Sequence, residues 1–460
     1  MVLAFSLLLQ SFGCNGFIEA VIQRKEIHHR QVSTLFWINA AISLVLALLF
    51  FASAPLIAGF YKEPLLKPIV AAMSLSIIFG GLSNQHVSLL ARNMQFYRTT
   101  ANELMAAFIS LTAAITLAWC GWGYWALVAK WVMAPLMITI GAWIMCGWRP
   151  CLPARRAGVW PLLTFAFHTY GNFIMSYFRR NLDKIMIGRS YGGQSLGAYD
   201  RAYHLSSMLP SQIINPLFSV AVSTFSKVVG DPEKYRYNYL NMISIMAFVG
   251  MPLSTALALV SKDVILLLLG PQWDEAGQIF LAFAPSIGII MIYITHGWLH
   301  LSLGTPDRWF RWSIIEFVVT VLCFIIGLPF GSLGIAISFT VSFYILLFPA
   351  LWYAGKPIQL EVSSVLSSLW KYYVAALVAG SLCWFIFYSC MAISNTFMVF
   401  NIIIRILIPV TLSISLYIVL IIALHRGIKP IFQFISVLHE MIPNIYLGKL
   451  FAILERRTHK

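Results

Sequence analysis

Charge is scarce in this sequence. Asp, Glu, Lys and Arg make up only 10% of the 460 residues, whereas roughly a quarter would be usual in a soluble domain. Hydrophobic residues make up 60%, and the mean hydropathy is +0.82. These values exclude an ordinary soluble protein and indicate a chain that crosses a membrane many times. At roughly 20 apolar residues per crossing, little length remains for a catalytic domain outside the membrane, so functional side chains must lie between helices.

Short chemical motifs are also missing. The seven cysteines form no C-x-x-C pair, and the sequence has no D-x-D, H-E-x-x-H or nucleotide-binding glycine loop. We therefore predict that the protein is not an enzyme and has no catalytic residue, bound metal or cofactor. The N-terminal apolar stretch lacks the basic start and the small-residue cleavage site of a signal peptide, so we expect it to belong to a helix.

Long apolar runs are what the sequence has instead. Bounded by charges, Pro and Gly, they predict an all-α polytopic fold with thirteen membrane helices. Their ranges are 1–22, 34–60, 66–90, 101–119, 123–146, 161–188, 199–226, 237–260, 276–303, 311–328, 332–353, 369–390 and 398–424. The runs at 161–188 and 199–226 carry polar residues through their length and are identified from spacing and context.

Lys and Arg are unevenly distributed among the connections. Of the 31, 21 fall in alternate connections and in the C-terminal tail, which predicts that this side faces the cytoplasm and that the C-terminus lies inside. The net charge of +15 therefore reflects orientation, and we expect no nucleic-acid partner. The 21 are Arg24, Lys25, Arg30, Arg92, Arg98, Arg149, Arg155, Arg156, Lys227, Lys234, Arg236, Arg308, Arg311, Lys356, Lys371, Arg426, Lys429, Lys449, Arg456, Arg457 and Lys460.

Landmarks of the first half recur about 209 residues later. QRKEIHHR at 23 matches PEKYRYNY at 232, PLIAGFYKEP at 55 matches VILLLLGPQW at 264, and GYWALVAKWV at 123 matches GSLGIAISFT near 331. Such repeats are common in transporters, so we predict two pseudo-symmetric helical bundles around a central cavity. The counterparts of the helices at 161 and 199 would start before residue 1. We therefore expect a fourteen-helix design whose first helix is missing, with a thirteen-helix protein as the alternative.

The expected organisation follows from the repeat. It has an N-terminal lobe at 1–147, truncated at its start, a cytoplasmic linker at 148–160 and a C-terminal lobe at 161–353. Two additional membrane helices fall within 354–424, and a basic amphipathic cytoplasmic tail covers 425–460. We expect the tail to lie on anionic lipid, with a protein partner as the alternative.

Five Lys and Arg residues lie together outside the alternate connections in which most of the others are found. They are Arg179, Arg180, Lys184, Arg189 and Arg201, with only Asp183 and Asp200 as local counter-ions. A charge at the bilayer centre costs at least ~2.5–3.5 kcal/mol, so the surplus needs a partner. An anionic ligand such as a diphosphate would satisfy it, since Arg gives bidentate contacts. For Arg179, Arg180 and Arg189, snorkelling to lipid headgroups stays open as the alternative, whereas Arg201, inside a helix beside Asp200, favours a binding site.

The polar and aromatic side chains of the same two helices fit a carbohydrate, because they offer donors, acceptors and rings to sugar hydroxyls and faces. These side chains are His168, Tyr170, Asn172, Tyr177, Asn181, Tyr191, Tyr199, Tyr203, His204, Gln212 and Asn215. Membrane-interface belts are the plainer explanation for most of the tyrosines. Glu103, Glu316 and Lys130 are candidates for ion coupling or gating, with interhelical pairing as the alternative.

Four segments resemble a known family. They are AVIQRKEIHHRQVSTLFWINA at 20–40, RNLDKIMIGRSYGGQSLGAYDRAYHLSSMLP at 180–210, VVGDPEKYRYNY at 228–239 and LLLLGPQWDEA at 266–276. They look like the lipopolysaccharide and exopolysaccharide flippases of the multidrug/oligosaccharidyl-lipid/polysaccharide superfamily, of the colanic-acid exporter type. Such proteins are similar to lipid II flippases, with fourteen helices in this branch, two lobes and a central cationic cavity. On this resemblance we expect the family's first helix to be missing from the chain.

The resemblance implies a flippase that translocates undecaprenyl-diphosphate-linked oligosaccharide across the bacterial inner membrane by alternating access. It assigns the cavity arginine after the Tyr-Asp pair to Arg201, and the preceding block to Arg180, Asp183 and Lys184. The expected partners are the lipid-linked oligosaccharide, the bilayer and other polysaccharide-assembly membrane proteins. The full predicted substrate site is Arg179, Arg180, Asn181, Asp183, Lys184, Asp200 and Arg201.

Two rival functions remain at this stage. A membrane polysaccharide polymerase or polyprenyl sugar transferase is one, although a polymerase would be expected to carry a long external loop and every external connection here is short. A multidrug or cation antiporter of the same superfamily is the other, and it predicts unpaired carboxylates in the cavity rather than a cationic surplus.

Overall fold

Every regular element that the structure describes is helical. The computed structural model describes residues 28–154, 160–389 and 400–441, together with Val2, Ser6 and Leu9. Within these residues, nine segments are long and apolar enough to cross a membrane, and one of them, Pro306–Ile358, contains two successive long helices, of 22 and 25 residues. The predicted total of thirteen is not confirmed, because the runs at 161–188 and 199–226 are not among the nine and the run at 1–22 lies almost wholly outside the described residues.

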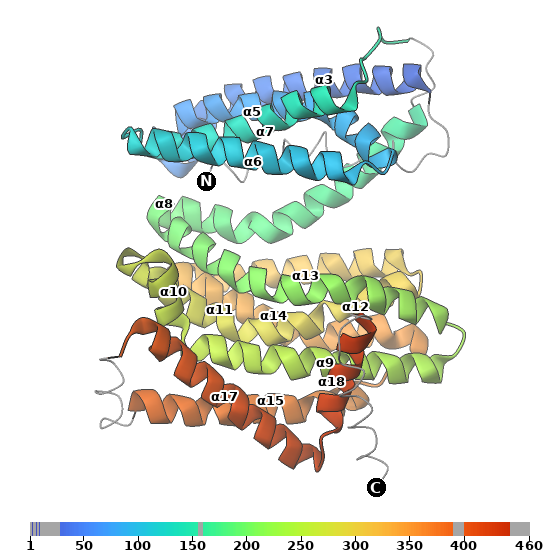
Figure 1. Ribbon diagram of the computed structural model, residues 1–460, viewed down its shortest axis with the longest axis vertical. Helices are drawn as coiled ribbons and strands as arrows, with labels where there is room; N and C mark the ends of the chain where they lie inside the picture. The colour runs from blue at the N-terminus through green and yellow to red at the C-terminus, as the bar shows by residue number, and fades with distance from the viewer. Residues whose placement is uncertain are drawn as a thin grey trace. The chain divides into compact units, whose positions relative to one another are not determined.

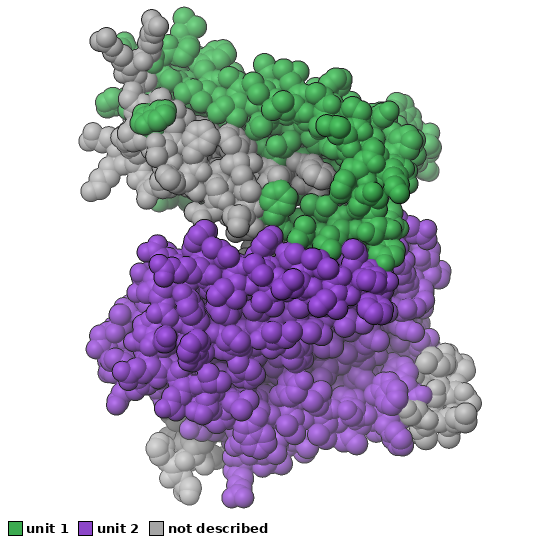
Figure 2. Space-filling view, turned by 180° about the vertical axis from the view of Figure 1, so that it is seen from behind, with its two compact units in different colours: residues 1–193 green, residues 194–460 purple. Residues whose placement is uncertain are grey.

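The chain forms two compact units, Met1–Gly193 and Gln194–Lys460, which Figure 2 colours separately. Unit 1 contains α3 (His29–Ala52), α4 (Ala54–Tyr61), α5 (Leu66–Arg92), α6 (Phe96–Trp119), α7 (Tyr124–Cys146) and the first part of α8 (Trp160–Lys227). In this unit α5 packs against both α3 and α7, and α6 packs against α7 (Figure 1).

Unit 2 begins with the second part of α8. It continues with α9 (Pro232–Leu259), α10 (Ser261–Leu269), α11 (Asp274–Tyr293), α12 (Thr295–Ser302), α13 (Pro306–Gly327) and α14 (Gly331–Gly355), then α15 (Val362–Trp384), α17 (Ile402–His425) and α18 (Lys429–Met441). Short turns of other helix types lie at η1 (Pro271–Trp273), η2 (Leu328–Phe330), η3 (Lys356–Ile358) and η4 (Phe385–Ser389). The sequence fixes the start of α9 through Asp231, whose side chain accepts a hydrogen bond from Lys234 N, with Pro232 in the first turn.

The two predicted helices at 161–188 and 199–226 are joined without a loop. Residues 160–227 are helical throughout except at Gly192, where φ is 80° and ψ is −172°. Only glycine populates this backbone region readily, so Gly192 ends one helix and lets the next begin at once. The predicted connection at 189–198 is therefore wrong. Hydropathy failed there because it does not detect a break made by a single residue.

The prediction of one helix at 34–60 is also wrong, because these residues form two helices. Its α3 ends at Ala52, and α4 begins at Ala54 with Pro55 in its first turn. Pro lacks the N–H that would continue α3 and clashes with the preceding turn. The run at 276–303 also forms two helices, α11 and α12, although no proline lies between Tyr293 and Thr295.

The predicted internal repeat is visible in the helix order and packing of each unit. The series α3, α4, α5, α6 and α7 corresponds to α9, α10, α11 with α12, α13 and α14, and α11 packs against α9 and α14 as α5 packs against α3 and α7. Both copies have a residue with left-handed backbone torsions at a corresponding place. Met94, at φ 57°, follows α5, and Gly304, at φ 65°, follows α12. In each copy an arginine also links two helices. Arg98 Nη1 of α6 donates to Met145 O near the end of α7 at 3.0 Å, and Arg308 Nη2 of α13 donates to Tyr353 O near the end of α14.

The central helices of both copies cross their neighbours closely at glycine. A side chain added at Gly81 on α5 would meet the Ser43 side chain of α3. In unit 2 the approach is backbone to backbone, because a Cβ placed on Gly288 of α11 would lie 2.8 Å from Gly250 O of α9. Small residues let membrane helices pack closely. These crossings fix α3 on α5 and α9 on α11.

The last helices attach to unit 2 through polar contacts as well as apolar ones. Asp263 of α10 forms an ion pair with Arg405 of α17. Tyr417 of α17 donates to Phe248 O of α9 at 3.1 Å. The Phe434 ring of α18 lies 5.4 Å from the Phe248 ring. These contacts join α17 and α18 to the repeat.

Candidate functional site

The second part of α8 presents an exposed polar face in unit 2. Arg201, His204, Gln212 and Asn215 are all exposed. At 3.6 residues per turn they fall within about 80° around the helix axis. Polar side chains on a membrane helix are costly against lipid and face water-filled cavities or protein instead. This stripe, which also contains the exposed Met208, is therefore suited to polar contacts.

The opposite side of the same helix is held by aromatic packing. Tyr199 is fully buried, with its ring 5.3 Å from that of Phe283 on α11. The Tyr203 ring lies 5.8 Å from Phe283 and 5.7 Å from Phe339 on α14. Residues two positions from Arg201 on either side lie on the far face of a helix. Burial of the tyrosines thus turns Arg201 outward, and Tyr199 belongs to the core rather than to the predicted sugar-binding set.

The predicted counter-ion of Arg201 is only partly accessible. Asp200 is half-buried, whereas Arg201 is exposed. An exposed guanidinium offers five N–H donors in a planar fork, suited to bidentate contact with a phosphate. Arg201 therefore has the exposure that a ligand contact requires.

The first part of α8 holds the remaining predicted residues, in unit 1. Asp183 is buried, and its Oδ1 accepts a hydrogen bond from Lys184 N at 2.8 Å. Asn181 and Lys184 are half-buried, and Asn181 Nδ2 donates to Tyr177 O at 2.9 Å. The side chains of Arg179 and Arg180 lie outside the described residues. Joining these residues with Asp200 and Arg201 in one site stays a prediction.

Arg189, the fifth cation of the cluster, has a partner of its own. Its guanidinium lies 5.5 Å from the centre of the Phe60 ring in unit 1. Such a cation–π contact stabilises an exposed arginine by about 0.5–1 kcal/mol. Arg189 therefore has a local interaction that does not need a ligand.

The three candidate coupling residues differ in environment. Glu103 is exposed on α6, Lys130 is half-buried on α7, and Glu316 is buried on α13. Their role in coupling or gating stays a prediction. Within residues 28–154, 160–389 and 400–441, no group of three or more His, Cys, Asp or Glu side chains is arranged to hold a metal ion.

One buried layer of polar side chains was not predicted from the sequence. Ser83, Asn84, Gln85, His86 and Ser88 of α5 are all buried in unit 1. The signal was present as the run SNQHVS inside an apolar helix, but averaging over a membrane-length window hides five polar residues.

Aromatic rings enclose the histidine of this layer. The His86 ring stacks on Trp143 of α7, with centroids 4.4 Å apart and planes at 28°, and meets the Phe36 ring of α3 edge-on at 6.0 Å. Trp143 Nε1 in turn donates to Leu82 O at 3.0 Å. The layer therefore joins the three helices at the centre of unit 1.

A repeated helical unit, many apolar spans and a polar stripe on one helix together define a polytopic membrane protein of the two-bundle transporter class. Residues 1–278 match the model of a family described as "Polysaccharide biosynthesis protein". The chain belongs to this family, which confirms the resemblance seen in its sequence. One relative, 25% identical over 325 residues and covering 71% of this chain and 66% of that protein, is the "Succinoglycan biosynthesis transport protein ExoT" of Rhizobium meliloti (strain 1021), whose name denotes transport rather than polymerisation or sugar transfer.

Similar proteins and a similar structure agree with this assignment. The chain is 24% identical over 351 residues to "Lipopolysaccharide biosynthesis protein WzxC" of Escherichia coli (strain K12), covering 75% of this chain and 69% of that protein. It is 26% identical over 374 residues to "Teichuronic acid biosynthesis protein TuaB" of Bacillus subtilis (strain 168), covering 79% and 76%. The fold resembles that of "Lipid II flippase MurJ, inward closed conformation", with a TM-score of 0.72 at 17% identity over 92% of this chain and 91% of that one.

Proposed function

We propose that this protein flips undecaprenyl-diphosphate-linked oligosaccharide units across the bacterial inner membrane, for O-antigen, capsule or exopolysaccharide synthesis. Membership of the polysaccharide biosynthesis family supports the class of substrate. The observation that carries the proposal is the exposed polar stripe of α8, with Arg201 on it, in a chain that is otherwise 60% hydrophobic.

Each part of such a substrate has a chemical match in the chain. Arg201 would contact the diphosphate, since a guanidinium binds phosphate oxygens in pairs. His204, Gln212 and Asn215 on the same face would exchange hydrogen bonds with sugar hydroxyls. The polyprenyl tail would stay in the bilayer while the headgroup crosses.

The second set of predicted residues would complete the site from unit 1. Arg179, Arg180, Asn181, Asp183 and Lys184 would also contact the substrate, as the family resemblance implies. We further propose alternating access, with lobes at 1–147 and 161–353 joined by a linker at 148–160. Helices within 354–424, a basic tail at 425–460 and a cytoplasmic C-terminus complete the proposed arrangement, supported by the Lys and Arg distribution.

The test uses Arg201→Ala in the protein, expressed in a bacterial strain that lacks its own flippase. Losing a charge-assisted contact costs about 1.5–3 kcal/mol, so export of surface polysaccharide should fall by about ten- to a hundredfold. Lys227→Ala is the matched control, because Lys227 is an exposed cation at the end of the same helix. Both variants should insert equally, as judged by membrane fractionation. Normal export by Arg201→Ala would show that this residue does not bind the substrate.

A further inference from the structure

The segment that follows α7 lies along α3 in unit 1. Residues 148–154 have no regular secondary structure, and they come after Gly147, whose φ of 65° ends α7. A backbone outside helices and strands has N–H and C=O groups that need partners. For part of this segment, side chains of α3 supply them.

Three hydrogen bonds join the segment to α3. Trp37 Nε1 donates to Cys151 O at 2.9 Å, and Cys151 N donates to Ser33 Oγ at 3.1 Å. Ala154 N donates to Thr34 Oγ1 at 3.1 Å. The three side chains of α3 fall within about 100° around the helix axis, so one face of α3 holds the segment.

An aromatic contact fixes the start of the same segment. The Trp148 ring lies 5.0 Å from that of His86 on α5 and 6.1 Å from that of Phe36 on α3, both edge-on. His86 belongs to the buried polar layer of unit 1. The segment is therefore attached at both of its ends, through Trp148 to the packed helices and through Ala154 to the face of α3.

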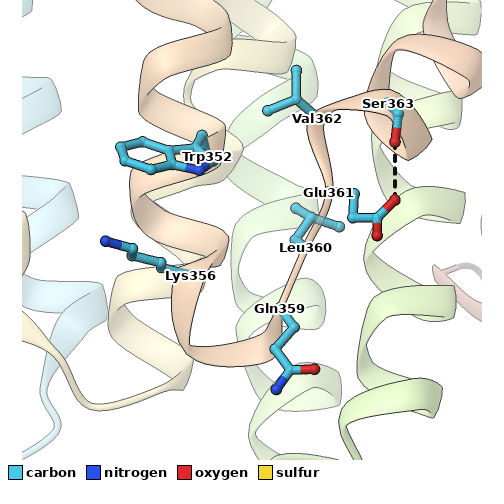
Figure 3. Close-up of a pocket in the computed structure, with 7 residues that line it drawn as sticks. All are labelled: Trp352, Lys356, Gln359, Leu360, Glu361, Val362 and Ser363. Carbon is cyan, nitrogen blue, oxygen red and sulfur yellow. Dashed lines mark hydrogen bonds between the residues drawn. The ribbon is translucent and has the colours of Figure 1, made fainter.

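The second repeat differs at the equivalent place. There the chain passes from α14 through η3 into α15, with only residues 359–361 between η3 and α15 (Figure 3). A hydrogen bond joins this turn to α9, the counterpart of α3, because Arg236 Nη1 donates to Ile358 O at 2.8 Å. Within the described residues, the long extended form of this segment is thus a feature of the copy that leads into α8.

Docking on α3 shortens the connection to α8, which begins at Trp160. The six residues that follow Ala154 up to Trp160 span at most about 20 Å, whereas the twelve that follow Trp148 would span about 40 Å. The docked segment therefore halves the distance by which the start of α8 can move away from this end of unit 1.

We propose that residues 148–154 are a clasp that positions α8 for transport, and that Ser33, Thr34 and Trp37 are the positioning residues that hold it closed. This inference rests on the proposed function, because the first part of α8 carries the predicted substrate residues at 179–184. The closed clasp limits how far these residues move relative to α3. Opening it lengthens the tether and slows translocation, while the side chains that bind the substrate stay in place.

The test removes the three hydrogen bonds together, with Ser33→Ala, Thr34→Val and Trp37→Phe. Each bond contributes about a fivefold shift between the docked and the undocked segment, so the triple variant shifts this equilibrium by about a hundredfold. Such a shift turns a docked majority of about ten to one into a minority of about one to ten, and export of surface polysaccharide should fall about tenfold. A triple variant that exports normally would refute the positioning role.

Amide hydrogen exchange of the purified protein in detergent measures the clasp itself. The amides of Cys151 and Ala154 should exchange slowly in the unaltered protein and about a hundredfold faster in the triple variant. Exchange as fast as in an unstructured peptide, measured on the unaltered protein, would overturn the proposal.

The matched control changes the same residue types on α6, with Ser110→Ala, Thr112→Val and Trp119→Phe. The hydroxyls of Ser110 and Thr112 donate to carbonyls of α6 itself. This control should keep both the slow exchange and normal export. An equal loss of export in the control would show that the effect does not come from the clasp.

A longer tether tests the same idea with every clasp contact intact. Three glycines inserted after Ala154 lengthen the connection by about 10 Å, so export should fall as it does in the triple variant. Normal export after the insertion would refute the role of tether length.

Binding separates the clasp from the proposed function. Native mass spectrometry with undecaprenyl diphosphate should show that the triple variant retains this lipid as well as the unaltered protein does, whereas Arg201→Ala should lose it. Loss of binding in the triple variant would refute a positioning role. Normal export by Arg201→Ala beside a failing clasp variant would overturn the assigned substrate contact alone, and the reverse result would overturn the clasp alone.

Discussion

The ion pair between Asp263 and Arg405 offers a sharp test of the energetics of unit 2. The Asp263 side chain is 5% exposed and the Arg405 side chain 21%. Burial raises the pKa of Asp263 above its ordinary value, and the nearby Arg405 acts in the opposite direction as the smaller effect. Arg405 therefore helps to keep a buried carboxylate charged.

The perturbation is Arg405→Met, which leaves that carboxylate buried without its partner. Removing one member of a buried pair costs about 3–5 kcal/mol, and the partial exposure of Arg405 places the expected loss near the lower end, about 3 kcal/mol. The second substitution Asp263→Asn should restore most of the stability, because it removes the uncompensated charge.

The pH dependence follows from the raised pKa of Asp263. In the window between the ordinary carboxyl pKa and the raised one, the folded chain binds more protons than the unfolded chain, so stability falls as pH rises through it. Without Arg405 the pKa of Asp263 rises further and the window extends upward. The deficit of Arg405→Met should therefore be largest at pH 8 and should shrink towards pH 5.

The assay is thermal unfolding of the purified protein in detergent at several pH values. Lys262→Met is the matched control, because Lys262 is an exposed cation beside Asp263; its effect should stay within about 0.5 kcal/mol. A loss in Arg405→Met that does not change with pH would refute the reasoning. So would a double variant as unstable as Arg405→Met alone.

Two further predictions concern the repeated helices and use the same unfolding assay. Gly81→Ala should destabilise unit 1 by about 1–3 kcal/mol, because the new methyl group would meet the Ser43 side chain, whereas Gly80→Ala has open space and should cost little; a second change, Ser43→Gly, should relieve the clash. Met94→Gly should stabilise by up to about 1 kcal/mol, since the left-handed backbone is costly for a side chain. Gly304→Ala should destabilise by a similar amount, and opposite signs would contradict this account of the repeat.

Much of the helical fold was predictable because burial in a bilayer demands long apolar runs. The runs at 66–90, 101–119 and 123–146 match α5, α6 and α7 to within a few residues. The junctions between successive helices were less predictable. A proline in the first turn of a new helix, as at Pro55, and a glycine at φ 80°, as at Gly192, act through backbone torsions that hydropathy does not measure.

The sequence shows which polar residues the candidate site contains, but it does not show which of them face outward. The polar residues on the second part of α8 are visible in the sequence, and so is the cation at Arg201. Which of them face outward depends on the burial of Tyr199 against Phe283, a contact between segments more than 80 residues apart in the chain. The same tyrosine was expected among the sugar contacts, because composition alone cannot separate a core ring from an exposed one.

The crossing of Gly250 and Gly288 constrains how unit 2 can move. A Cβ added at Gly250 would lie 3.1 Å from both Gly288 Cα and the Met291 sulfur, and one added at Gly288 would lie 3.1 Å from the Met251 sulfur. Sliding α9 along α11 by one residue would drive a methionine side chain into backbone. We therefore expect the two helices to move as a single block if the protein works by the proposed alternating access.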